Sequence, residues 1–212
     1  MGDPPGLSDQ QRRALDRLSL LPVLGAYYLA GGTGLAIQLS HRRSAELDFF
    51  SLTPVADFDA VKREVETSFD RVEVRAETDA ALHLLCDGLP IDFVRYPYPL
   101  LDPPSEAFGV ALAGVRDLAV MKLAAISRRG LRRDFWDLHE ALQRTGLSLR
   151  ACGEAYVARF GIREADLYHV LRALTYFDDA ERDGVFPPGL DGKQWEAVKA
   201  FFVKEAPKLV SL

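Results

Sequence analysis

The chain has 212 residues, 48% of them hydrophobic and 27% charged, which is typical of a globular protein with a substantial hydrophobic core. Its net charge of −5 argues against a general electrostatic grip on nucleic acid, and its apolar runs fall short of the roughly 20 residues that a membrane span needs. Because the N-terminus does not resemble a secretory signal and the two cysteines are far apart, we expect a cytoplasmic protein without a membrane partner.

The predicted strands all fall in the first half of the chain, where apolar runs are short or alternate with polar residues. They occupy residues 25–32, 46–50, 71–77 and the two arms of a hairpin over 81–96, which turns at Asp87-Gly88. Helices are predicted at residues 9–20, before the first strand, and at residues 33–40 and 57–69, between strands. In this interpretation Gly31 and Gly32 end the first strand.

A proline-rich loop is predicted at residues 96–109, and only helices are predicted after it. These helices occupy residues 115–128, 134–145, 148–160, 164–177 and 193–206. Strands in the first half and helices in the second indicate an α+β fold. We therefore expect an α+β domain over residues 1–110, followed by a helical domain over residues 111–212.

Three carboxylates suggest a metal site. Glu46 and Asp48 leave the same face of a strand, about 7 Å apart, and at an effective dielectric near 20 their repulsion costs on the order of 2 kcal/mol. A divalent cation between the two carboxylates replaces their repulsion with attraction to the metal. Hard oxygen ligands of this kind suit Mg²⁺ or Mn²⁺. Asp92 interrupts an apolar strand and would complete the cluster if the two strands are neighbours. A solvated strand end and a structural aspartate are the alternatives.

A phosphate site is predicted just before the carboxylates. Gly31 and Gly32 let the backbone approach a ligand, Thr33 offers a hydroxyl, and the free N–H groups of the following helix attract an anion. Arg42 could hold a further phosphate oxygen. The alternative is an ordinary glycine turn.

Lys122 is the one charged residue between Leu118 and Ile126, so its helix is predicted to be buried. A buried ammonium needs an anion, which is either a bound phosphate or a structural acid. Asp134 and Asp137 share one face of the next helix, where Asp134 either caps the helix or fixes Lys122 or an arginine. Four arginines nearby could grip an acceptor: Arg128, Arg129, Arg132 and Arg133.

Two segments carry a family resemblance. The stretch LAGGTGLAIQLSHRRSAELDFF (29–50) resembles the signature of the AbiEii/AbiGii toxin family and, more broadly, of the DNA polymerase β-like nucleotidyltransferase superfamily. The stretch DLAVMKLAAISRRGLRRDFWDLHEAL (117–142) resembles a later segment of the same family. The likeness implies a nucleotidyltransferase-like mixed β-sheet with flanking helices, followed by a C-terminal helical domain.

The resemblance also implies an activity, namely Mg²⁺-dependent transfer of a nucleoside monophosphate from an NTP. The acceptor would be an RNA such as a tRNA, a protein or a small molecule, and the chain would be the toxin of a bacterial toxin–antitoxin pair with an antitoxin as partner. Under it, Glu46, Asp48 and Asp92 bind the metal and act with Lys122 in catalysis, while Gly31, Gly32, Thr33 and Arg42 bind the nucleotide.

Two residues depart from the family pattern. Glu46 stands where the family most often has Asp, which moves the carboxylate by about 1.5 Å, and Arg133 stands where it usually has Lys. Active-site geometry generally has to hold within about 0.5 Å, so the longer side chain of Glu46 could displace its carboxylate far enough to impair catalysis. An alternative function is therefore a catalytically impaired module that binds a nucleotide or a partner.

Overall fold

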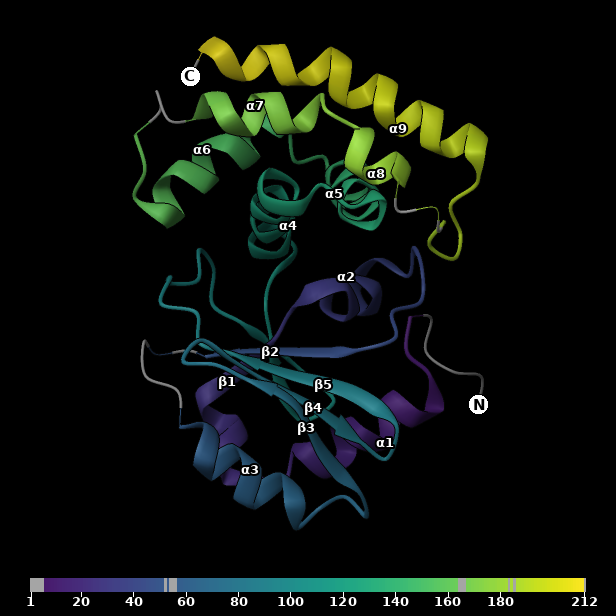
Figure 1. The fold of residues 1–212 in the computed structure, drawn as a ribbon. Coiled ribbons are helices and arrows are strands. Elements are labelled where there is room, and N and C mark those ends of the chain that lie inside the picture. Colours follow the sequence, from purple (N-terminus) through teal and green to yellow (C-terminus); the bar gives the residue numbers. More distant parts are fainter. Residues whose placement is uncertain are drawn as a thin grey trace. The chain divides into compact units, whose positions relative to one another are not determined.

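The computed structural model describes residues 6–51, 53, 57–163, 167–182, 184 and 186–211. The chain forms two compact units, Met1–Gly114 and Val115–Leu212 (Figure 1). The described strands all belong to the first unit, and the described part of the second unit is helical. The predicted α+β fold class is confirmed.

The first unit is built on a mixed seven-stranded sheet in the order β3-β4-β5-β2-β1-β7-β6. Its strands are β1 (Tyr27–Leu29), β2 (Leu47–Ser51), β3 (Val72–Glu77), β4 (Ala81–Cys86), β5 (Leu89–Val94), β6 (Ser105–Ala107) and β7 (Val110–Leu112). The pairs β2/β5 and β1/β7 are parallel, and the other neighbours are antiparallel. As a result, β2 and β5 lie side by side at the centre, as the predicted carboxylate cluster requires.

The helices of this unit are α1 (Asp9–Leu18), the 3₁₀ helix η1 (Pro22–Ala26), α2 (Gly31–Leu39) and α3 (Phe58–Glu66). Helices α1 and α3 cover one face of the sheet and α2 lies on the other (Figure 1). Leu15 of α1 and Val61 of α3 pack with Phe49 and Phe93 of the central strands in one hydrophobic core. Asp48 of β2 and Asp92 of β5 lie on the opposite face of the sheet.

The first strand is shorter than predicted, because Gly31 and Gly32 begin α2 instead of ending the strand. The N–H of Ala30 still bonds to the Asp48 carbonyl in the sheet, while the Ala30 carbonyl already accepts from the N–H of Gly34. Gly31 makes this abrupt change with a φ of 61°, which favours glycine. The glycine pair therefore lies at a helix N-terminus, directly beside β2.

The predicted loop at 96–109 contains strand structure. Strand β6 lies within it and pairs with β7 across a tight turn at Phe108-Gly109, whose φ values are 54° and 71°. Three-residue strands next to prolines do not produce a clear alternating pattern, so the sequence did not reveal them. The Asp87-Gly88 hairpin, in contrast, forms as predicted, with φ values of 48° and 84°.

The second unit contains α4 (Val115–Arg129), α5 (Arg132–Thr145), α6 (Leu149–Phe160), α7 (Tyr168–Leu174), α8 (Asp178–Arg182), α9 (Gly192–Glu205) and the 3₁₀ helix η3 (Ala206–Ser211). The helix predicted over 164–177 is shorter in the described part, and its residues 164–166 lie outside the described residues. Helix α8 was not predicted.

The core of the second unit is aromatic where α5 meets α9, with Phe135 packed against Trp195 and Phe202. A fully buried ion pair joins α4 to α6, with Nη1 of Arg159 2.6 Å from Oδ1 of Asp117. Among the described residues, none of the helices has the length and apolar character needed to cross a bilayer.

Candidate active site

Parallel pairing of β2 and β5 places Asp48 directly beside Asp92. Both side chains lie on the face opposite the core, since Leu47 and Phe49 on one strand and Ile91 and Phe93 on the other are fully buried. Glu46 precedes β2 by one residue. Its backbone carbonyl accepts hydrogen bonds from the Thr33 hydroxyl and, at 3.3 Å, from Nε2 of Gln11.

The start of α2 lies against the Asp48 carboxylate. A Cβ atom added at Gly31 would overlap Oδ2 and Cγ of Asp48, so only glycine fits here. A Cβ atom added at Gly32 would overlap Nη2 of Arg42 and would lie 3.3 Å from the Ser44 hydroxyl. The glycine pair therefore allows a carboxylate and a guanidinium to approach the same helix N-terminus.

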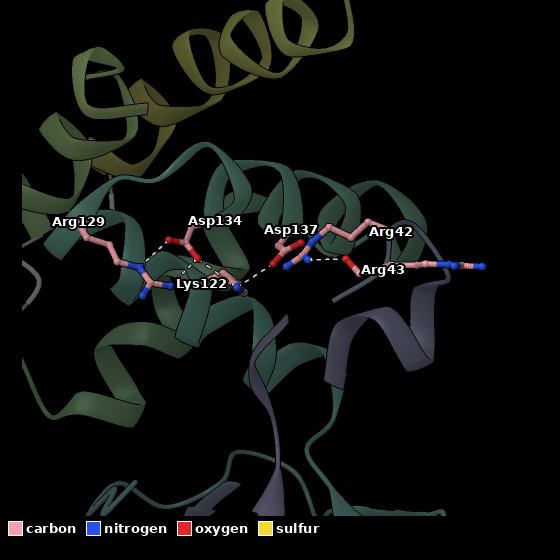
Figure 2. Close-up of polar contacts among 6 residues, drawn as sticks. All are labelled: Arg42, Arg43, Lys122, Arg129, Asp134 and Asp137. Atoms are coloured by element: carbon pink, nitrogen blue, oxygen red, sulfur yellow. Dashed lines mark hydrogen bonds and ion pairs between the residues drawn. The ribbon is translucent and has the colours of Figure 1, made fainter. Parts of the chain in front are cut away.

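Thr33 is fully buried, and its hydroxyl is already engaged with the Glu46 carbonyl. It fixes the segment before β2 to the first turn of α2. Arg42 is held in turn by a hydrogen bond of 3.0 Å from its Nη1 to the Arg43 carbonyl (Figure 2). The predicted nucleotide-binding residues are thus assembled around one helix end.

Asp92 is bonded to a residue that sequence reasoning left aside. Nδ1 of His83, on β4, lies 2.9 Å from Oδ2 of Asp92. Burial raises the pKa of Asp92 above its ordinary value; His83 lowers it in part, and the negative charge of Glu46 adds to the increase. Asp92 therefore holds a proton more readily than an ordinary aspartate does.

His83 could have been found from the sequence by counting. The two-residue turn at Asp87-Gly88 pairs Cys86 with Leu89, and stepping back three residues on each arm pairs His83 with Asp92. No role was assigned to His83 from the sequence. It is instead the side chain that holds the third carboxylate.

Within the part of the chain that the structure describes, no group of three or more His, Cys, Asp or Glu side chains is placed to hold a metal ion. One oxygen of Asp92 contacts His83, and the Asp48 carboxylate lies against Gly31. The oxygen donors of Glu46, Asp48 and Asp92 nevertheless suit a hard divalent cation, and they share one face of neighbouring strands. The three-ligand metal site stays a prediction.

In the second unit, Lys122 lies between two buried carboxylates (Figure 2). Its Nζ is 3.1 Å from Oδ1 of Asp134 and 2.7 Å from Oδ2 of Asp137, both of them fully buried aspartates. Arg129 also donates two hydrogen bonds to Asp134, from Nε to Oδ2 at 2.9 Å and from Nη2 to Oδ1 at 3.1 Å. Burial alone would raise the pKa of Asp134, but Lys122 and Arg129 together lower it.

Asp134 does not cap its helix, so the capping alternative is wrong. Helix α5 begins after Leu131, and the Asp134 side chain points to Lys122 and Arg129 instead. Two positive and two negative charges balance in this network, which satisfies the need of a buried ammonium for an anion. Lys122 therefore has structural partners, and a role at phosphate remains to be tested.

A family model described as "Nucleotidyl transferase AbiEii toxin, Type IV TA system" matches residues 13–209. The chain belongs to the AbiEii nucleotidyltransferase toxin family. The match spans both units, so the AbiEii family pattern extends beyond the carboxylate-bearing sheet into the helical unit. Membership confirms the resemblance and makes nucleotidyl transfer and a toxin role the activity of the family.

Three known proteins resemble this AbiEii family member. An uncharacterized protein of Aquifex aeolicus is 34% identical over 203 residues, which cover 94% of this chain and 95% of that protein. The structure of MenT4, a nucleotidyltransferase toxin of Mycobacterium tuberculosis, has a TM-score of 0.54 at 18% identity and covers 95% of this chain and 85% of its own. The structure of the antibiotic-resistance factor ANT(2'')-Ia has a TM-score of 0.55 at 15% identity and covers 76% of this chain and 97% of its own. The two structures establish the fold.

Proposed function

We propose that this AbiEii family member is a metal-dependent nucleotidyltransferase that moves a nucleoside monophosphate from an NTP to an acceptor. The observation that carries the proposal is the register of Asp48 with Asp92 beside the glycine-opened start of α2. That register joins a place for phosphate and a place for a cation on one face of the sheet. The first unit would hold this chemistry.

The triphosphate would lie at the N-terminus of α2. The first N–H groups of a helix have no partner within the helix and attract anions, and Gly31 and Gly32 leave room for phosphate oxygens to approach. Thr33 would contribute its backbone N–H, since its hydroxyl is used by Glu46. Arg42, whose guanidinium lies against Gly32, would bind a further phosphate oxygen.

Glu46, Asp48 and Asp92 would hold Mg²⁺ or Mn²⁺. When bound, such a cation neutralises phosphate charge and polarises the bond that breaks. The acceptor hydroxyl oxygen would form a bond to the α-phosphorus, the bond to the β-phosphate oxygen would break, and pyrophosphate would leave. Asp92 would take the hydroxyl proton, which suits a carboxylate whose pKa is raised by burial. A role of Lys122 at phosphate stays a prediction from the family resemblance, since in the structure Lys122 is paired with Asp134 and Asp137 of its own unit.

The acceptor would be an RNA such as a tRNA, a protein or a small molecule. The family description supports a toxin paired with an antitoxin. We propose that it acts in the bacterial cytoplasm, where NTPs are supplied. A second candidate, a module that binds nucleotide without turnover, is favoured by one observation, namely Glu46 at the place of the usual aspartate. The two candidates differ in turnover and share NTP binding.

Turnover of NTPs labelled at the α-phosphate tests the proposal. The purified chain is incubated with each NTP, with Mg²⁺ or Mn²⁺ or with chelator, and with RNA, protein and small-molecule fractions of a bacterial lysate. We expect label to move to one fraction, with the metal required and the Asp48→Asn variant inactive. NTP binding without transfer in every fraction would favour the binding module.

A further inference from the structure

His83, Asp92 and Asp48 form a row across three neighbouring strands. Register places His83 of β4 opposite Asp92 of β5, and Asp92 opposite Asp48 of β2. Neighbouring strands lie about 4.8 Å apart, and residues paired in this way point to the same face. His83 is thus the next polar side chain beyond the predicted metal-binding carboxylates.

The hydrogen bond uses one oxygen of Asp92 and leaves the other. Nδ1 of His83 is 2.9 Å from Oδ2, and within the described residues His83 is the hydrogen-bond partner of this carboxylate. Because a carboxylate rotates about its last side-chain bond, holding Oδ2 also fixes the direction of Oδ1. Oδ1 is therefore the atom that can accept a ligand.

The remaining exposure of the pair fits a site on the open face of the sheet. The side chains of His83 and Asp92 are 40% and 23% exposed, so neither belongs to the apolar core that contains Leu82, Leu84 and Phe93. A surface ion pair of this exposure contributes little to stability, with typical values of about 0–1 kcal/mol. A purely stabilising role would thus be weak.

We propose that His83 is a positioning residue, which fixes the Asp92 carboxylate so that its free oxygen points at the bound cation and the acceptor hydroxyl. This inference rests on the proposed function. Hydrogen-bond partners of ligating carboxylates orient them, and removing such a partner typically costs about 10- to 100-fold in metal affinity or activity. His83 would touch neither the metal nor the nucleotide itself.

Two substitutions separate a hydrogen-bond role from a packing role. His83→Phe keeps a flat ring and removes the donor, whereas His83→Asn keeps an N–H donor close to the position of Nδ1. The full chain is titrated with Mn²⁺ alone by calorimetry, and kcat and KM for the NTP are measured separately. His169→Asn, on the exposed side of α7, serves as the matched control.

We expect His83→Phe to weaken Mn²⁺ binding by about 10- to 100-fold and to lower kcat, with little change in KM, since the phosphate site on α2 is intact. His83→Asn should recover most of both losses, and all variants should unfold at nearly the wild-type temperature. Equal Mn²⁺ affinity and kcat in wild type and His83→Phe would overturn the inference while the proposed function stands. If the wild type bound no Mn²⁺, and so behaved like the Asp92→Asn variant, both the inference and the proposed function would be overturned.

Discussion

The carboxylate of Asp48 lies directly against the α-carbon of Gly31, so that a methyl group in place of the glycine hydrogen would overlap it. Gly31 also has a φ of 61°, a conformation that side-chain-bearing residues rarely adopt. One residue thus satisfies two requirements of the site, namely the sharp entry into α2 and the space beside the carboxylate.

Replacement of Gly31 by alanine is therefore expected to damage both fold and site. The left-handed conformation costs about 1 kcal/mol, and displacing Asp48 adds to that. We expect a lower unfolding temperature and loss of Mn²⁺ binding by calorimetry. The control is Gly25→Ala, since a Cβ at Gly25 meets no atom within 4 Å. If Gly31→Ala bound Mn²⁺ as well as Gly25→Ala does, the predicted metal site would be misplaced.

The sequence predicted the face on which the carboxylates lie because strand alternation is a local property. Leu47 and Phe49 are buried, and Asp48 and Phe50 are on the other side, as the pattern of apolar residues indicated. The neighbour relation of β2 and β5 is not local, and it came from the predicted need for a third carboxylate. The sheet order confirms that relation.

Other features could not be predicted from single-residue patterns. Whether Gly31 ends a strand or begins a helix depends on its φ and on the Ala30 hydrogen bonds, which composition does not reveal. The partners of Lys122 depend on how α4 packs on α5, and the sequence left a bound phosphate and a structural acid open. His83 required the register of a hairpin to be followed for several residues.

Replacing Asp92 by asparagine should separate stability from activity. Because burial raises the pKa of Asp92, ionising it costs more in the folded than in the unfolded chain, so this group destabilises the fold at neutral pH. We expect Asp92→Asn to unfold at the wild-type temperature or above at pH 7, while nucleotidyl transfer is lost. Asparagine can still accept the His83 hydrogen bond through its Oδ1.

The sign of the pH dependence gives a second check on Asp92. The stability advantage of Asp92→Asn should disappear as the pH falls below the ordinary aspartate value of 3.8, where Asp92 is protonated in both states. Thermal unfolding of both proteins between pH 7 and the acid range measures this. If the stability advantage of Asp92→Asn grew toward acid pH, the raised pKa of Asp92 would be contradicted.

Lys122→Met should destabilise the second unit. Methionine matches the apolar stem but leaves Asp137, which is fully buried, without its ammonium partner at 2.7 Å. Removing one partner of a buried ion pair costs about 3–5 kcal/mol, and here Arg129 still compensates Asp134. Chemical denaturation of the wild type and the variant measures the loss in the free energy of unfolding.

A double variant tests whether the lost charge pairing causes that effect. Lys122→Met combined with Asp137→Asn also removes the negative charge that lies 2.7 Å from the ammonium in the wild type, so we expect it to recover part of the stability that Lys122→Met loses. NTP binding of the double variant then reports on the phosphate role separately from folding. Normal NTP affinity in a folded double variant would show that Lys122 serves structure alone.

Glu46→Asp distinguishes an active enzyme from a module that has lost catalysis. If the site is built around the longer glutamate, aspartate withdraws the carboxylate by about 1.5 Å, and turnover should fall although the usual family residue is restored. In a decayed site the same change should strengthen Mn²⁺ binding or restore turnover, because the other groups still suit an aspartate. The fixed Glu46 carbonyl, bonded to Thr33 and Gln11, keeps the backbone in place, so the comparison isolates the side chain. We expect loss of turnover; an inert wild type with an active Glu46→Asp variant would instead establish the binding module.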